Sequence, residues 1–201
     1  MAFSNYDELK TSIANWADRD DLTSFIPDFI ALTEARFNRS LRLRSMEQSQ
    51  FATTVSGQTN YALPLHYLQM REFRLNQTPT ISLRYVSPEI YESWNLGSGI
   101  PQFYTIIANE IRIGPSPAGE HEMEMLFWRR FPALSSSEPV NWMLQNAPDV
   151  YLYGSLLELE PFVQNDARIQ VWGTGYAKAI EDIQFADDKD RHSGSALTVQ
   201  S

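Results

Sequence analysis

Apolar and polar residues alternate through residues 102–131, near the middle of the chain. The alternation is broken at Asn109-Glu110 and again by a glycine- and proline-rich stretch at 114–119. A period of two with such breaks predicts three antiparallel strands joined by two turns, at about 103–107, 111–113 and 122–128. We expect this meander to form the core on which the rest of the chain packs.

A second alternating region precedes the meander. Residues 51–55, 61–63, 73–75 and 81–85 alternate in the same way, with turn-forming residues between them. The strands should therefore lie mainly within 48–86 and 102–131. Ser87-Pro88-Glu89 then has the composition of a helix start and predicts one short helix before Gly97.

Both ends of the chain have apolar residues at helical spacing. The pattern predicts helices at about 5–17, 24–42, 149–160 and 165–185. Ser4 with Asp7 reads as the capping box of the first helix, and Pro161 separates the last two. Four amphipathic stripes need each other's apolar faces. The shared core should include Trp16, Phe29, Phe37, Leu156, Trp172 and Tyr176.

The fold class that follows is α+β, a bundle of N- and C-terminal helices packed with an antiparallel β-sheet region. At 201 residues the chain is expected to be one domain over residues 1–186 with a flexible arm over 187–201. The arm starts with a charged run and continues through Ser193-Gly194-Ser195. Its end is apolar and β-prone, so Leu197 and Val199 are candidate contacts to a partner.

The composition of the chain excludes several classes of function. The net charge is −9, so the protein should repel DNA on average, although an acidic wall lets a polyanion slide past. The absence of cysteine excludes disulfides, thiolate metal sites and a cysteine nucleophile. No apolar run approaches a membrane span, and the N-terminus has no signal-peptide pattern.

Residues with catalytic potential are scattered. His66, His121 and His192 have no partner at ligand spacing, so we expect no metal site and no cofactor. Glu122 and Glu124 share one face of a strand, which indicates a solvated face or, as the alternative, an acid/base pair. The sequence therefore predicts no catalytic residues.

Two arginine groups are the candidate interface. One comprises Arg36, Arg39, Arg42 and Arg44 at the end of the second helix, and the other comprises Arg129 and Arg130 after the last strand. Arginine suits bidentate ion pairs at protein interfaces, and the helix dipole also favours cations at this end. Ion pairs between subunits are the first interpretation, and a DNA contact and a solvated face are the alternatives.

Three blocks of the sequence resemble the head-to-tail adaptor proteins of tailed bacteriophages, also called connector or tail tubular protein A-like proteins. They are IPDFIALTEARFNRSLRLRSME at 26–47, YALPLHYLQMREF at 61–73, and a third block that begins with PQFYTIIANEIRIGPSPAG at 101–119. The third block continues through residues 141–183. The order of the blocks and their aromatic positions carry the resemblance.

The resemblance implies a structural virion protein in the neck between head and tail, made in the host cytoplasm. Family members form a ring, typically of twelve copies, docked under the portal protein, and tail proteins attach below. Their C-terminal segment often reaches a neighbour or the portal. DNA passes through such a ring without sequence-specific binding, and no membrane is involved. The family pattern contains no catalytic residues, so the protein is not expected to be an enzyme.

Two other functions remain open at this point. One is a tail-terminator or tail-completion ring protein. The other is a tail-associated glycan hydrolase that works through Glu122 and Glu124.

Overall fold

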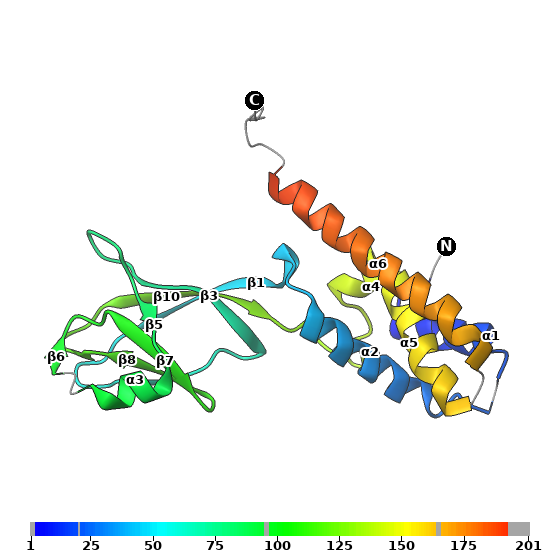
Figure 1. The fold of residues 1–201 in the computed structure, drawn as a ribbon, viewed down its shortest axis with the longest axis horizontal. Coiled ribbons are helices and arrows are strands. Elements are labelled where there is room, and N and C mark those ends of the chain that lie inside the picture. Colours follow the sequence, from blue (N-terminus) through cyan, green and yellow to red (C-terminus); the bar gives the residue numbers. More distant parts are fainter. Residues whose placement is uncertain (1–2, 20, 95–96, 164–165, 193–201) are drawn as a thin grey trace. The chain divides into compact units, whose positions relative to one another are not determined.

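The structure is a computed structural model that describes residues 3–19, 21–94, 97–163 and 166–192. The chain forms two compact units (Figure 1). Met1–Ser45 and Phe131–Ser201 make a helical unit, and Met46–Arg130 make a β unit. The α+β class is confirmed. That residues 1–186 behave as a single domain stays a prediction.

The helical unit is built around one central helix. It contains α1 (Tyr6–Ala17), α2 (Ile26–Ser40), α4 (Trp142–Asn146), α5 (Pro148–Val163) and α6 (Asp166–His192). α5 packs against each of the other four, which is why its sequence is apolar on almost every side. The predicted packing of N-terminal helices against C-terminal helices is confirmed.

Most of the predicted core residues lie in this helical core. Phe37 and Leu156 are fully buried, and Phe29 and Tyr176 are nearly so. Trp172 is half-buried. The prediction was wrong for Trp16, which is 47% exposed and packs at the edge against the rings of Tyr153 and Trp172. The buried stripe of α1 runs through Leu9, Ile13 and Ala17, so Trp16 lies beside it in the last turn.

The helix boundaries differ from the predicted ones in four places. The N-cap of α1 is Asn5, whose side chain accepts a hydrogen bond from the Glu8 amide, while Ser4 binds the Glu8 carboxylate instead. α2 ends at Ser40 instead of 42. α5 continues through Pro161, because Phe162 packs on Phe25 and Phe29 and holds the last turn in place. α6 continues to His192, so residues 187–192 belong to a helix and not to the arm.

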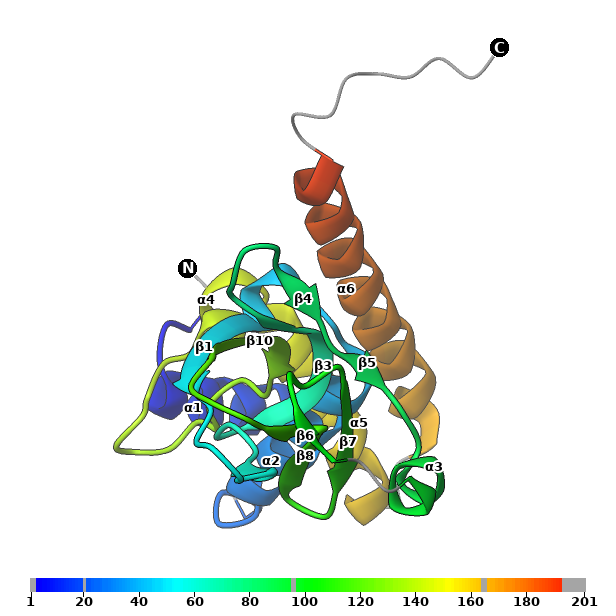
Figure 2. The ribbon, with the colours of Figure 1, turned by 90° about the vertical axis from the view of Figure 1, so that its left-hand side faces the viewer.

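The β unit contains two four-stranded sheets, seen in Figures 1 and 2. The first has the order β1-β10-β3-β4, formed by Glu47–Thr53, Glu122–Arg129, Tyr67–Leu75 and Ile81–Ser82. The second has the order β2-β8-β7-β5, formed by Asn60–Ala62, Glu110–Gly114, Phe103–Ile107 and Arg84–Tyr85. Three short elements complete the unit: α3 (Pro88–Ser93), β6 (Ser98–Gly99) and β9 (Ser116–Pro117). A fourth, η1 (Arg44–Met46), lies where the chain passes from the helical unit to the β unit.

The two sheets share one hydrophobic core. Phe73, Met125 and Phe127 from the first sheet pack with Ile111 and Ile113 from the second. Every residue of this cluster comes from the β unit. Within the helical unit, the helices bury their apolar residues against each other. That the helices also pack on the strands of the meander stays a prediction.

The prediction of a three-stranded meander is confirmed only in part. β7 and β8 form the expected antiparallel hairpin, with Ile106 opposite Ile111. β10 does not continue that sheet, because it pairs with β1 and β3 in the other one. The stretch at 114–119 is too long for a tight turn, and Ser116–Pro117 pairs in parallel with β6. A second parallel pair, β5 with β7, also departs from the expected antiparallel sheet.

A buried polar network fixes residues 131–141 to the helical unit. The Glu34 carboxylate on α2 accepts hydrogen bonds from the Leu134 amide at 2.8 Å and the Tyr151 hydroxyl at 2.9 Å. Asn141 donates to the same hydroxyl at 2.6 Å. Glu34 is only 7% exposed, and this burial raises the pKa of its carboxyl although both hydrogen bonds lower it. Burial likewise raises the pKa of Tyr151.

Two glycines mark close helix contacts. A Cβ atom added to Gly154 on α5 would lie 2.4 Å from Cγ2 of Thr33 on α2 and 3.1 Å from the Tyr176 ring on α6. A Cβ atom on Gly175 would meet the Tyr153 ring at 3.1 Å. Gly173 on the same helix has more room, because the nearest atom to an added Cβ atom there, in Leu157, is 3.9 Å away.

Candidate assembly interface

Arg36 takes part in a contact within the helical unit. Its guanidinium forms an ion pair with Glu158 on α5 and lies over the Tyr176 ring of α6, 5.8 Å from the ring centroid. Burial raises the pKa of Tyr176 to about 12, although the nearby Arg36 lowers it. Arg36 therefore joins three helices of one subunit and is poorly placed to pair with a second subunit.

Arg42 and Arg44 also make contacts inside the helical unit. Arg42 lies beyond the end of α2 and donates to the Asn38 and Leu41 carbonyl oxygens, at 3.1 and 2.6 Å. The arginine group predicted at the end of the second helix is therefore divided, since α2 ends at Ser40 and Arg42 and Arg44 lie beyond it. Arg44 pairs with Asp187 at 3.5 Å and with Asp190 at 3.3 Å on α6.

Three of the candidate arginines have no such ion pair. Within the described part of the chain, Arg39, Arg129 and Arg130 form no salt bridge. Arg39 and Arg130 are exposed and Arg129 is half-buried. Arg39 belongs to the helical unit and the other two to the β unit. Leu197 and Val199, the remaining candidates, lie outside the described residues.

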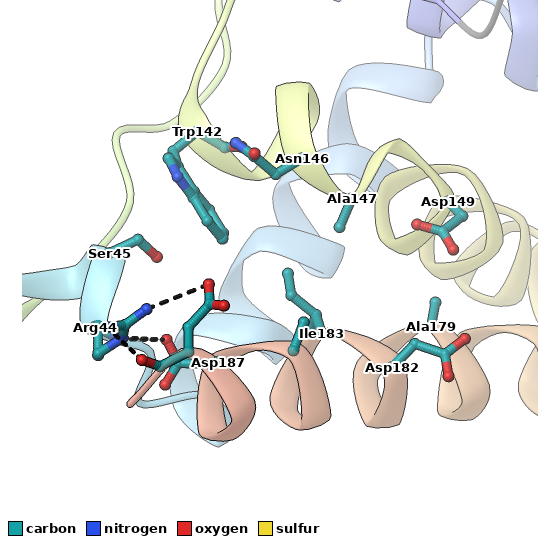
Figure 3. A pocket seen from close by; sticks show the side chains of 12 residues that line it. Arg44, Ser45, Trp142, Asn146, Ala147, Asp149, Ala179, Asp182, Ile183 and Asp187 are labelled. Carbon is teal, nitrogen blue, oxygen red and sulfur yellow. Dashed lines mark hydrogen bonds and ion pairs between the residues drawn. The ribbon is translucent and has the colours of Figure 1, made fainter. Parts of the chain in front are cut away.

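A cavity of about 580 Å³ lies beside Arg44 (Figure 3). Its apolar lining comes from Trp142, Ala147, Ala179 and Ile183, and acidic residues, Asp149 and Asp182 among them, also line it. Trp142 is 37% exposed, and its ring stacks on that of Phe131. The Arg44 ion pairs close one end of this cavity with α6.

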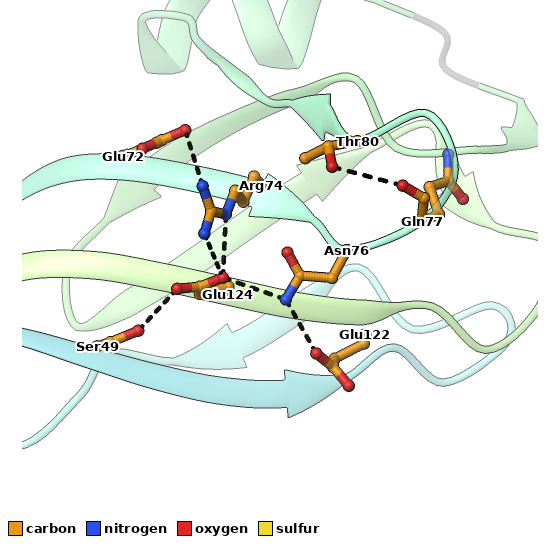
Figure 4. A network of polar contacts seen from close by, with 8 residues as sticks. All are labelled: Ser49, Glu72, Arg74, Asn76, Gln77, Thr80, Glu122 and Glu124. Carbon is orange, nitrogen blue, oxygen red and sulfur yellow. Dashed lines mark hydrogen bonds and ion pairs between the residues drawn. The ribbon is translucent and has the colours of Figure 1, made fainter.

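Glu122 and Glu124 belong to a polar network on the outer face of the first sheet (Figure 4). Arg74 pairs with Glu124 at 2.8 Å, and the Asn76 amide donates to both carboxylates, at 2.9 and 3.1 Å. Ser49 donates to Glu124 from β1 at 3.0 Å. The hydrogen bonds from Arg74, Asn76 and Ser49 lower the pKa of Glu124. A general acid needs a raised pKa, so this carboxylate is unsuited to protonating a leaving group.

The sequence pattern missed one exposed apolar cluster. Phe25 and Phe162 are 42% and 53% exposed, and their ring centroids lie 5.1 Å apart. They bring together the start of α2 and the end of α5. Phe25 falls at helical spacing with the apolar residues of α2, so the sequence pattern gives no sign that its side chain is exposed.

Two other kinds of site, a metal site and a membrane-spanning helix, are absent from the described residues. No group of three or more histidine or acidic residues there could hold a metal ion. No helix in the same part of the chain has the length and apolar character that crossing a membrane requires.

Comparison with known proteins matches nearly the whole chain to one family. No individual curated protein matches. Residues 4–200 match the SU10 adaptor protein family, so the match covers both the helical unit and the β unit. The resemblance seen in the sequence blocks is thereby confirmed. The chain belongs to the SU10 adaptor protein family, a family of phage head-to-tail adaptors.

Proposed function

We propose that this phage adaptor is the subunit of a ring of twelve copies that docks under the portal protein and offers tail proteins their attachment surface. The family match over residues 4–200 carries the proposal. The protein acts as a structural component of the virion neck and has no enzymatic activity. The paired, ionised state of Glu124 supports the second point.

The charge of the chain fits a channel through which DNA travels. A net charge of −9 repels a polyanion, so DNA passes without being held and without sequence-specific contacts. The arginines then serve protein contacts. Arg39 and Arg130 are the best placed, because both are exposed and form no salt bridge within the described residues.

Assembly should depend on the portal. Exposed ion pairs contribute only ~0–1 kcal/mol each, so the isolated chain should be a monomer at micromolar concentration. Contacts repeated around a ring add up once a template arranges the subunits. We expect native mass spectrometry to show a monomer alone and a ring of copies bound to purified portal. A tail-completion protein, the second candidate, would not bind portal directly, so rings formed without portal binding would contradict the proposal.

Replacing Arg39 and Arg130 together by glutamine should weaken assembly on portal severalfold and leave folding intact. Exposed substitutions change stability by less than about 0.5 kcal/mol, so the melting temperature should hold. Arg36→Gln is the matched control, because it breaks an ion pair inside one subunit and should lower stability instead. Normal assembly of the double variant, with salt-sensitive duplex DNA binding lost, would assign the arginines to DNA.

A further inference from the structure

β1 is the open edge of the first sheet. It pairs with β10 along seven consecutive residues, from Glu47 opposite Trp128 to Thr53 opposite Glu122, with no shift in register. Among the described residues, no strand lies on its other side. β1 is thus a long, regular strand with one row of main-chain groups available to a partner.

The register identifies which main-chain groups point outward. The Thr54 amide donates to the His121 carbonyl at 2.9 Å, so even-numbered residues of this strand face β10. Alternation then turns the main-chain groups of Glu47, Ser49, Phe51 and Thr53 away from the sheet. An added strand would find donors and acceptors at these four positions.

Sheet edges are normally protected by lysine, proline or bulges, and β1 has none of these. The opposite side of the same sheet differs, since β3 carries two register shifts and is partly covered by β4. Residues 48–53 are uncharged, and Phe51 is 58% exposed among them. In a strongly acidic protein, this neutral and partly apolar edge favours a neutral partner strand.

We propose that the edge of β1 binds the C-terminal residues 196–199 of a second copy as an added strand. This segment reads Ala-Leu-Thr-Val, which is β-prone, and residues 193–201 contain no charged side chain. It follows Ser193-Gly194-Ser195, a composition that lets it take up an extended course after α6 ends at His192. The neutral edge and the neutral segment match in charge, and strand addition needs only main-chain groups and a few apolar contacts.

The inference rests on the proposed ring and gives it a connection between neighbours. Each copy then contributes one edge and one C-terminal strand, which is a head-to-tail interface of the kind that closes into rings. It also assigns a role to Leu197 and Val199, which stand two residues apart and share one face of a strand.

The test uses a fluorescent peptide of residues 193–201 and the full-length chain, with binding followed by anisotropy. We expect the peptide to bind, and Ser49→Pro to weaken binding about tenfold or more, because proline removes an outward donor and leaves its partner unpaired. Ser49→Ala is the matched control. It keeps the amide and loses only the hydroxyl contact to Glu124, so it should bind as the wild type does.

Several results would overturn the proposal. One is a peptide that does not bind, and another is Ser49→Pro binding equally well. If Ser49→Pro does not fold, Thr53→Pro with Thr53→Ala repeats the comparison at the other end of the strand. A third result is self-association of the chain that Ser49→Pro abolishes but excess peptide does not reduce. It would show that the partner of the β1 edge is β1 of a second copy instead of residues 196–199. No portal is present in this assay, so its failure and failure of portal binding are independent.

Discussion

Replacing Glu34 by alanine is expected to lower the free energy of unfolding by about 2–4 kcal/mol at pH 7. The substitution removes the acceptor of the Leu134 amide and of the Tyr151 hydroxyl. Tyr151 is fully buried, so water cannot replace the lost partner there. A cavity in a packed core adds to the loss. Urea unfolding at equilibrium measures the change.

Glu34→Gln is the matched control and also a test of pH dependence. Glutamine keeps the accepting oxygen, so most of the stability should remain. The raised pKa of Glu34 means that the folded state holds its proton more tightly than the unfolded state does. Its contribution to stability is therefore complete below the unfolded pKa and is lost as the pH rises through the folded pKa. The wild type should lose stability relative to Glu34→Gln as the pH rises above the ordinary pKa of a glutamic acid side chain, and the opposite trend would contradict the assigned network.

The second large effect concerns Gly154, where alanine should destabilise the helical unit by about 1–3 kcal/mol. The new Cβ atom would stand 2.4 Å from Cγ2 of Thr33. Alanine gains about 1 kcal/mol in helix propensity, which offsets part of that cost. Thermal unfolding of the variant measures the balance.

Gly173 provides the control for the same substitution. An added Cβ atom there meets only Leu157, at 3.9 Å, so Gly173→Ala should stabilise α6 by about 0.5–1 kcal/mol. Thr33→Ser removes Cγ2 and keeps the hydroxyl that donates to the Phe29 carbonyl. Adding Thr33→Ser to Gly154→Ala should recover stability, and strictly additive losses would show that the contact with Thr33 is unimportant.

The sequence predicted the existence of the helices well, because apolar residues recur at helical spacing in each of them. In α2 the spacing also shows which side chains are buried, Phe29 and Phe37 among them. The boundaries failed where tertiary contacts overrode local signals. Pro161 reads as a helix end, yet Phe162 packs beyond it, and the charged run after Asp187 reads as a tail, yet Arg44 pairs with it.

The sequence predicted where the strands lie more reliably than it predicted which strands pair with each other. Nothing in the alternation of residues 122–128 says whether they pair with the strand just before them or with residues 47–53, far away in sequence. Interface residues were harder still to identify from the sequence. Arg36 and Arg39 look alike on the helix face, and only the position of Glu158 on another helix distinguishes them.

The pairing of Glu47 with Trp128 places the entrance and the exit of the β unit on adjacent strands. The β unit is thus an insertion in the chain between α2 and the later helices, which the chain enters after Ser45 and leaves after Arg130. Loops within such an insertion can lengthen, shorten or change sequence without altering the path of the chain through the helical unit. During evolution, such an adaptor can therefore change the contacts made by its β unit while its helical unit stays the same.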